Sequence, residues 1–343
     1  MNSTLLDFML ASIYYFPSAK IYKKIVLFAI ISVRKCMKRA FFAFYLLFYF
    51  FIWHFMCYFA PEMKIIHHIQ ELKAEIAAAR TAGKTIGLVP TMGALHEGHA
   101  SLVRRSVAEN DITVVSIFLN PTQFNDPRDL ERYPRTLDAD CELLTTCGAQ
   151  IAFAPSVAEV YPEPDTRHFS YPPTDSVMEG AMRPGHFNGV CQIVSKLFSY
   201  VDPDRGYFGE KDFQQIAVIR RMVADLGFKL QIVPCPVVRE ASGLALSSRN
   251  SLLTPEERAI APHIYAALKA SREFARTHSV QLTREYVEAR VNAVPGLRIE
   301  YYSIVDAASL ADVNDWNDAK EIVGCITVYC GAKPIRLIDH IHY

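Results

Sequence analysis

The sequence predicts an α/β protein in which a doubly wound parallel sheet is followed by a smaller α+β domain. Three observations support this class. Short apolar runs alternate with helical stretches between residues 85 and 237, which is the rhythm of parallel β-α-β units. Beyond Asn250 the pattern changes to two polar helices and then two strands. A chain of 343 residues, about half of them apolar, is also long enough to form two cores.

The first domain is expected at residues 63–237. We expect strands at residues 85–90, 112–118, 151–155, 205–209 and 229–238. Helices are expected from about His99, near Asp138, at Val190–Val201 and at Lys211–Leu226. Because helices connect successive strands, the strands should pair in parallel. The arrangement is that of a Rossmann-like nucleotide-binding domain.

The second domain is expected at residues 238–343. Helices are predicted at Pro255–Thr277 and Thr283–Val294, and strands at residues 297–305 and 321–329. Here helices and strands are segregated along the sequence, which is typical of α+β structure. We therefore expect a small second domain after the parallel sheet.

Charge and cysteine content exclude several classes of protein. The net charge of the chain is zero, and residues 63–343 hold 29 Lys and Arg against 34 Asp and Glu. Such a balance does not indicate a nucleic-acid partner. The eight cysteines include no CxxC motif. We interpret them as reduced, buried thiols of a cytosolic protein.

The strongest motif is VPTMGALHEGHASLV, which begins at Val89. A strand, a glycine turn and a helix start follow one another, and His96 and His99 share one helix face. Donors at a helix N-terminus can hold a polyphosphate and stabilise charge that develops on it. Two histidines at this spacing could also be metal ligands or ordinary surface residues.

Three further segments carry polar side chains at predicted element ends. In FLNPTQF, Gln123 follows a strand, where open sheets place ligand loops. In GEKDFQQ, Lys211 could neutralise a phosphate and Gln215 lies one turn further on. In GLALSSRN, the hydroxyls and Arg249 could close over phosphates. Taken singly, these segments are better interpreted as a turn, a solvated helix start and an N-cap.

In this order and at these separations, the four segments resemble the pantothenate synthetases, which belong to the HxGH nucleotidylyltransferase superfamily. The resemblance runs from Met63 to Tyr343 and includes YPRTLDADCELL, RPGHFNGV and the closing RLIDHI. It implies an ATP-binding set made of Met92, Gly93, Ala94, Leu95, His96, Glu97, Gly98, His99, Gly209, Glu210, Lys211, Asp212, Val238, Leu246, Ser247, Ser248 and Arg249. It also implies that Gln123 and Gln215 hold pantoate and that Gln123 lies near beta-alanine.

The resemblance further implies a two-step reaction. The carboxylate of pantoate attacks the α-phosphorus of ATP, and pantoyl adenylate forms with release of pyrophosphate. The amine of beta-alanine then displaces AMP to give pantothenate, a precursor of coenzyme A. His99 would act as proton donor, assisted by His96, while Mg²⁺, Lys211 and Arg249 compensate the charge of pyrophosphate. A cytoplasmic homodimer is expected.

Residues 1–62 match nothing in that family. They hold eighteen of the forty aromatic residues, and the apolar run Phe41–Ala60 is long enough to span a bilayer. Its basic flank would keep the N-terminus in the cytoplasm and carry the rest of the chain away from ATP. We therefore expect Met63 to be the biological start. Membrane association is the alternative if the apolar run is translated.

Two departures and two competing functions accompany this prediction. Ser242 stands where the family often has Asp, and Asn188 where Arg is common, which leaves loop dynamics and substrate affinity open. One competing function is a nucleotidylyltransferase that stops after transferring AMP to a phosphorylated acceptor, although the neutral Gln123 and Gln215 favour an unphosphorylated acid. The other is a membrane-anchored nucleotide-binding protein without turnover.

Overall fold

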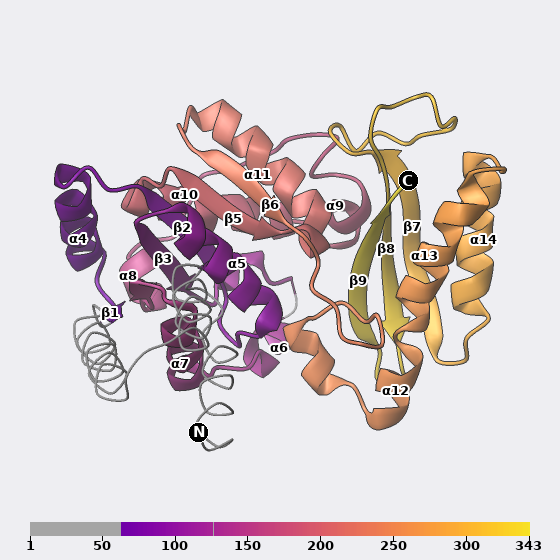
Figure 1. Cartoon of the computed structure of the whole chain (residues 1–343), viewed down its shortest axis with the longest axis horizontal. Helices are drawn as coiled ribbons and strands as arrows, with labels where there is room; N and C mark the ends of the chain where they lie inside the picture. Colours follow the sequence, from indigo (N-terminus) through magenta and orange to yellow (C-terminus); the bar gives the residue numbers. More distant parts are fainter. Residues whose placement is uncertain (1–62, 126) are drawn as a thin grey trace, which may run out of the picture. The chain divides into compact units, whose positions relative to one another are not determined.

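The computed structural model describes residues 63–125 and 127–343 (Figure 1). The predictions for residues 1–62, including the apolar run Phe41–Ala60, lie outside the described residues. Within the described ranges, no helix combines the length and apolar character needed to cross a bilayer.

A six-stranded, fully parallel sheet forms the larger part of the fold, with strand order β1-β4-β3-β2-β5-β6. Its strands are β1 (Lys64–Ile66), β2 (Ile86–Thr91), β3 (Ile112–Ile117), β4 (Ile151–Phe153), β5 (Arg205–Gly209) and β6 (Gln231–Cys235). The chain moves from β2 through β3 to β4, then crosses back to place β5 on the other side of β2. This reversal makes the carboxyl ends of β2 and β5 the place where such sheets bind ligands.

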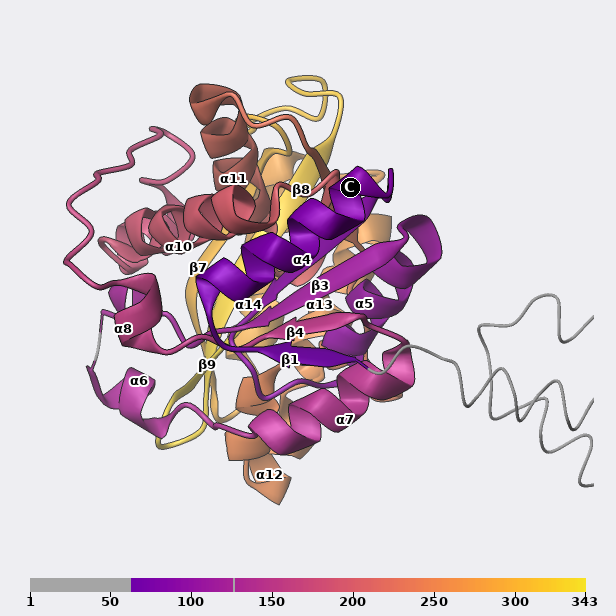
Figure 2. The same cartoon turned by 90° about the vertical axis from the view of Figure 1, so that its left-hand side faces the viewer.

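Helices cover both faces of this sheet (Figure 2). The long helices are α4 (Ile69–Thr81), α5 (Glu97–Glu109), α7 (Leu137–Cys147), α10 (His186–Val201) and α11 (Phe213–Leu226). Side chains of α4, α10 and α11 form the core on one face, and those of α5 and α7 form the core on the other. Shorter turns are η1 (Pro121–Gln123), α6 (Pro127–Arg132), α8 (Val157–Val160), α9 (Met178–Met182) and η2 (Glu210–Asp212).

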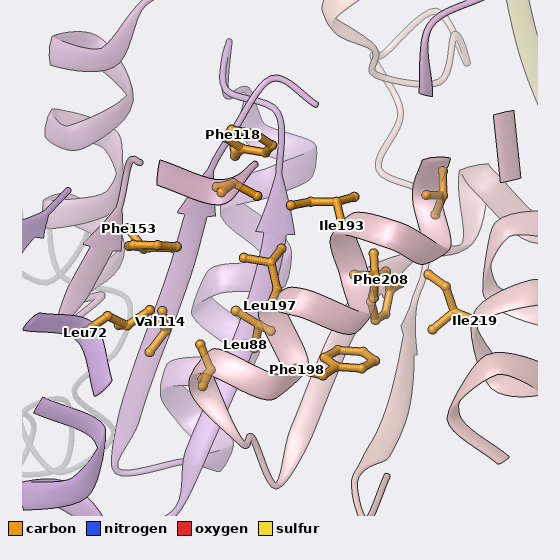
Figure 3. Packing of buried hydrophobic residues seen from close by; sticks show 14 of the residues in the cluster. Leu72, Leu88, Val114, Phe118, Phe153, Ile193, Leu197, Phe198, Phe208 and Ile219 are labelled. Carbon is orange, nitrogen blue, oxygen red and sulfur yellow. The ribbon is translucent and has the colours of Figure 1, made fainter. Parts of the chain in front are cut away.

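Helix α10 buries its apolar face in the larger core. Its apolar residues Val190, Ile193, Val194 and Leu197 recur at three- and four-residue spacing and are all buried, as expected for a helix packed on a sheet. Figure 3 shows Ile193 and Leu197 pointing toward the strand that carries Leu88. Full burial of side chains of this size stabilises the fold by roughly 1.5–3 kcal/mol each.

The remainder of the chain builds a smaller antiparallel sheet of order β7-β8-β9. Its elements are η3 (Ser248–Leu252), α12 (Pro255–Ile260), α13 (His263–Ala275), α14 (Val280–Asn292), β7 (Leu297–Asp306), β8 (Ile322–Cys330) and β9 (Ile335–His342). Helices α13 and α14 pack on one face of this sheet. The opposite face meets α9 and α11 through Met178, Ala217, Val323 and Cys325.

The predicted fold class is confirmed: a Rossmann-like parallel sheet with helices, and a small antiparallel sheet after it. The expected helix Pro255–Thr277 is wrong in one respect, because the chain forms two helices with a break at Ala261 and Pro262. Proline lacks an N–H group and clashes with the preceding turn, so it starts a new helix. The sequence analysis did not anticipate β1, α4 or β9. The domain division at residue 237 stays a prediction.

The cysteines behave as expected in the described ranges. Cys141, Cys147, Cys191, Cys235, Cys325 and Cys330 are all free and buried. Burial raises the pKa of the Cys191 thiol to about 12, and that of the Cys325 thiol also to about 12. These cysteines are therefore protonated packing residues at neutral pH.

Candidate active site

A cavity of about 240 Å³ lies at the carboxyl ends of β2 and β5. Fourteen of the residues predicted for the site line it: Met92, His96, Gly98, His99, Gln123, Gly209, Lys211, Asp212, Gln215, Val238, Leu246, Ser247, Ser248 and Arg249. Segments more than 150 residues apart in the sequence thus meet around one space. The cavity coincides with the reversal in strand order, where open α/β sheets place their ligands.

The glycine turn after β2 is fixed by a buried carboxylate on helix α7. Asp140 is 2% exposed and accepts hydrogen bonds from the backbone N–H groups of Ala94 at 3.0 Å and Leu95 at 2.8 Å. Gly93 and Ala94 both have positive φ, at 81° and 51°, a conformation that costs little only for glycine. Asp140 therefore compensates a strained turn, and this turn sets the position of His96.

His96 and His99 form a capping box at the N-terminus of α5. The Nδ1 atom of His96 accepts the N–H of Gly98 at 3.1 Å, and Nδ1 of His99 accepts the N–H of His96 at 3.3 Å. Their ring centroids are 4.1 Å apart. A Cβ atom at position 98 would lie 2.8 Å from Cε1 of His96. A side chain at position 98 would therefore displace the His96 ring.

The charge state of both histidines follows from their surroundings. Burial, followed by the Lys211 charge, lowers the pKa of His96 to about 4. Burial and then the neighbouring His96 lower the pKa of His99 to about 3. Both imidazoles are thus neutral at neutral pH and carry one proton each. Because each Nδ1 accepts a backbone N–H, the proton resides on Nε2 and is available to a ligand.

Lys211 lies across the cavity from the histidines, in the turn η2 that follows β5. Its Nζ atom is 3.4 Å from Oδ2 of Asp212, whose side chain is partly exposed at 44%. Gln215 lines the same cavity one turn further on. A cation, a carboxylate and an amide therefore occupy this side, which suits an anionic ligand accompanied by a cation.

The segment Leu246–Arg249 closes the cavity from the C-terminal part of the chain. Ser248 donates its hydroxyl to the carbonyl oxygen of Ala94 at 3.2 Å, so the segment is tied to the glycine turn. Ser247 caps η3 by accepting the N–H of Arg249 at 3.3 Å. Arg249 lines the cavity, and its planar guanidinium has donors that match phosphate oxygens.

A second part of the cavity is built around Gln123, which is buried. Its Nε2 group donates to Sδ of Met92 at 2.9 Å, and its Oε1 accepts from Asn120 at 3.1 Å. Asn120 also donates to the carbonyl oxygen of Gly189 at 3.0 Å and accepts from the hydroxyl of Tyr161 at 2.8 Å. The amide of Gln123 is therefore oriented by a network of neutral groups.

His186 holds the backbone of Gln123 in place through a hydrogen bond. Arg183 can only donate, so its contact at 3.2 Å makes Nε2 of His186 the acceptor. The proton of His186 is then on Nδ1 and is donated to the carbonyl oxygen of Gln123 at 2.9 Å. Burial, followed by the Arg183 charge, lowers the pKa of His186 to about 4 and keeps it neutral.

Five predicted residues do not line the cavity: Gly93, Ala94, Leu95, Glu97 and Glu210. The first three form the turn held by Asp140. Glu97 forms an ion pair with Arg104 on the outer surface of α5. Several lining residues were not predicted from the sequence, among them Asn120, Tyr133, Arg183 and His186. The NPT, YPRT and RPGH segments carried them, but nothing local showed that they converge.

The two departures from the family pattern lie outside the lining. Asn188 accepts the N–H of Phe169 at 2.8 Å, which fixes the loop before α9. Ser242 accepts the N–H of Leu244 at 3.4 Å beside Gly243, whose φ is 94°. Each side chain therefore shapes a loop without reaching the cavity.

The donor set of the cavity fits a magnesium ion that arrives with a nucleotide. Among the described lining residues, Asp212 is the only carboxylate. Mg²⁺ is usually held by one or two carboxylates together with substrate phosphates and water. Asp212 is accordingly the residue that would hold it.

Comparisons with known proteins identify related chains. The profile of the pantoate-beta-alanine ligase family matches residues 64–342. A pantothenate synthetase of Bacteroides fragilis is 64% identical over 281 residues, which cover 82% of this chain and 99% of that protein. One from Porphyromonas gingivalis is 57% identical over 281 residues, with the same coverage of 82% and 99%.

Solved structures show the same relationship. A pantothenate synthetase of Thermus thermophilus superposes with a TM-score of 0.76 at 43% identity, covering 81% of this chain and 99% of that one. The pantoate-beta-alanine ligase of Francisella tularensis, solved with beta-gamma ATP and beta-alanine, gives a TM-score of 0.66 at 33% identity and covers 81% and 97%.

Proposed function

Since this chain belongs to the pantoate-beta-alanine ligase family and is a pantothenate-forming ligase, we propose that the cavity at the ends of β2 and β5 carries out both steps of the reaction. The observation that supports this most is the pair of neutral histidines, His96 and His99, at the N-terminus of α5. Together with Lys211 and Arg249 they surround one space with donors. The structure of the Francisella relative with beta-gamma ATP supports the same nucleotide here.

In the first step, a carboxylate oxygen of pantoate attacks the α-phosphorus of ATP, and the bond from that phosphorus to the β-phosphate oxygen breaks. Negative charge accumulates on the α-phosphate oxygens and on departing pyrophosphate. His96 and His99 donate through Nε2 to the former, and Lys211 and Arg249 balance the latter. Mg²⁺, held by Asp212 and the phosphates, would supply further charge compensation.

The acceptor half of the cavity suits pantoate because it presents amides. A hydroxy acid offers hydroxyls and a carboxylate. The side-chain amides of Gln123 and Gln215 can accept hydrogen bonds from the hydroxyls and donate them to the carboxylate. A phosphorylated acceptor would instead call for basic side chains. Asn120 and Met92 fix the side-chain amide of Gln123 before substrate arrives, and His186 holds its backbone carbonyl group.

In the second step, the amine of beta-alanine attacks the acyl carbon of pantoyl adenylate, and AMP leaves with the electron pair of the broken bond. No enzyme nucleophile is required, because the mixed anhydride is already a good acyl donor. We further propose that the protein works in the cytoplasm, where ATP is available, and, as the resemblance to the pantothenate synthetases implies, as a homodimer.

The experiment is to incubate the full chain with ATP, Mg²⁺ and pantoate and to measure pyrophosphate. Pyrophosphate close to one equivalent per active site is expected before beta-alanine is added, followed by pantothenate and AMP on its addition. If pyrophosphate appears only when beta-alanine is present, the adenylate step is wrong. If no pantoate-dependent pyrophosphate forms at all, the assignment of the cavity fails.

A further inference from the structure

We propose that Glu210, His340 and His342 form a binding site for a divalent transition-metal ion of the zinc type. Each side chain offers one ligand atom, and the three atoms all lie within 4.8 Å of one another. None of the three residues lines the nucleotide cavity described above. The cluster lies outside that lining but next to it, because Glu210 directly precedes Lys211 and the charge of Asp212 acts on His340.

The backbone brings the three side chains together. His340 and His342 are two residues apart on β9, so their side chains project from the same face of the strand. That face lies against η2, which begins at Glu210 directly after β5. Phe213 packs beside both imidazoles, with ring centroids 5.3 Å from His340 and 5.7 Å from His342.

The polar atoms of this cluster lack hydrogen-bond partners among the described residues. His340 is only 5% exposed, and its Nδ1 atom is buried without a hydrogen-bond partner. Within residues 63–125 and 127–343, Glu210 and the ring of His342 also make no hydrogen bond or ion pair. Buried polar groups are nearly always satisfied, and an orphaned one signals an ion or water that completes it.

The cluster supplies a mixed ligand set. His340 and His342 each offer an imidazole nitrogen, and Glu210 adds a carboxylate oxygen, so the set has two nitrogens and one oxygen.

The ligand set also selects the metal. Two imidazoles and one carboxylate suit Zn²⁺, whereas Mg²⁺ requires oxygen ligands. With bonds of about 2.0–2.1 Å, the ligands of a tetrahedral Zn²⁺ lie roughly 3.4 Å apart. The atoms therefore need to converge by about an ångström, and the exposed His342 has the freedom to do so. The fourth position is left for water.

The test is zinc binding by the untagged full chain, measured by equilibrium dialysis with Zn²⁺ alone and with Mg²⁺ present. His342→Ala removes one ligand from an exposed position, and His263→Ala removes a comparably exposed histidine of α13 as the matched control. The wild type and His263→Ala should bind one equivalent of Zn²⁺ more than His342→Ala binds. If His342→Ala still binds that equivalent, its affinity should be at least about tenfold lower. Magnesium should not displace this equivalent.

A second readout does not depend on counting ions. Co²⁺ in place of Zn²⁺ should give a visible absorption band of a low-coordinate nitrogen and oxygen site in the wild type, and His342→Ala should lose it. Zinc should also raise the melting temperature of the wild type and not that of His342→Ala. Equal zinc stoichiometry and affinity in the wild type and His342→Ala would overturn the proposal.

Discussion

The buried carboxylate of Asp140 offers a sharp test of how the glycine turn is held. It accepts two backbone N–H groups, from Ala94 and Leu95, and the hydroxyl of Thr136 at 3.1 Å. Asp140→Asn keeps the size of the side chain but replaces one acceptor oxygen by an NH₂ group. One buried N–H then faces another donor, which costs about 2 kcal/mol.

A loss of about 2 kcal/mol corresponds to a fall in melting temperature of roughly 4–8 °C for a domain of this size. The turn also positions His96, so pantoate-dependent pyrophosphate release should fall by tenfold or more. Asp138→Asn is the matched control, because Asp138 lies on the same helix and is exposed. Equal melting temperatures and equal rates in the two variants would refute the role given to Asp140.

Three further results are expected. Glu179→Gln should lower the free energy of unfolding by roughly 2 kcal/mol relative to Glu142→Gln in denaturant titrations, since the buried Glu179 accepts two hydrogen bonds from Arg336, which then keeps only Glu300 as its ionic partner among the described residues. Equal unfolding curves would contradict this. The melting temperature should fall as the pH drops from about 6.5 toward 4. Burial lowers the pKa of the three cavity histidines, so the unfolded chain takes up protons that the folded chain does not. A melting temperature that does not change with pH over this range would count against neutral histidines. Lys211→Ala should lose pyrophosphate release while its circular dichroism spectrum stays that of the wild type, and a normal rate would remove Lys211 from the reaction.

Glu179 contributes a pH dependence of folding stability that differs from that of the histidines. Burial alone would raise its pKa, but the hydrogen bonds and charge of Arg336 outweigh this and hold it at about 2. The folded pKa thus lies below the unfolded one, and the stability that Glu179 contributes is present above about pH 4.5. It is lost as the pH falls from there toward 2, a range that overlaps the lower end of the histidine range because the pKa of His99 is about 3.

Much of the fold could be predicted because its signals are local. Apolar runs such as Ile86–Thr91 and Ile112–Ile117 are short and bounded by polar turns, so the sequence locates them well. Helix α10 was expected from Val190 but begins at His186. The extra turn starts after Gly185, which adopts a φ of 83° that only the folded chain reveals.

Part of the candidate site could likewise be predicted from the sequence, and part could not. The HxGH turn was predictable because a strand, a glycine turn and two histidines occupy one stretch of sequence. Asp140 was not, because its role depends on helix α7 packing over a turn 46 residues earlier. His186 and Asn120 likewise act through backbone groups of distant segments. Residues that support others across the fold carry no local pattern, so only the structure identifies them.

We propose that neutral His99 donates a hydrogen bond from its Nε2–H group to the reacting phosphate. The direct measurement is the single-turnover rate of pantoyl adenylate formation by His99→Ala, compared with the wild type and with His263→Ala. Loss of one such donor should slow the step by roughly 10²- to 10³-fold, while His263→Ala keeps the wild-type rate. A rate for His99→Ala close to that of the wild type, in protein that folds normally, would contradict the account.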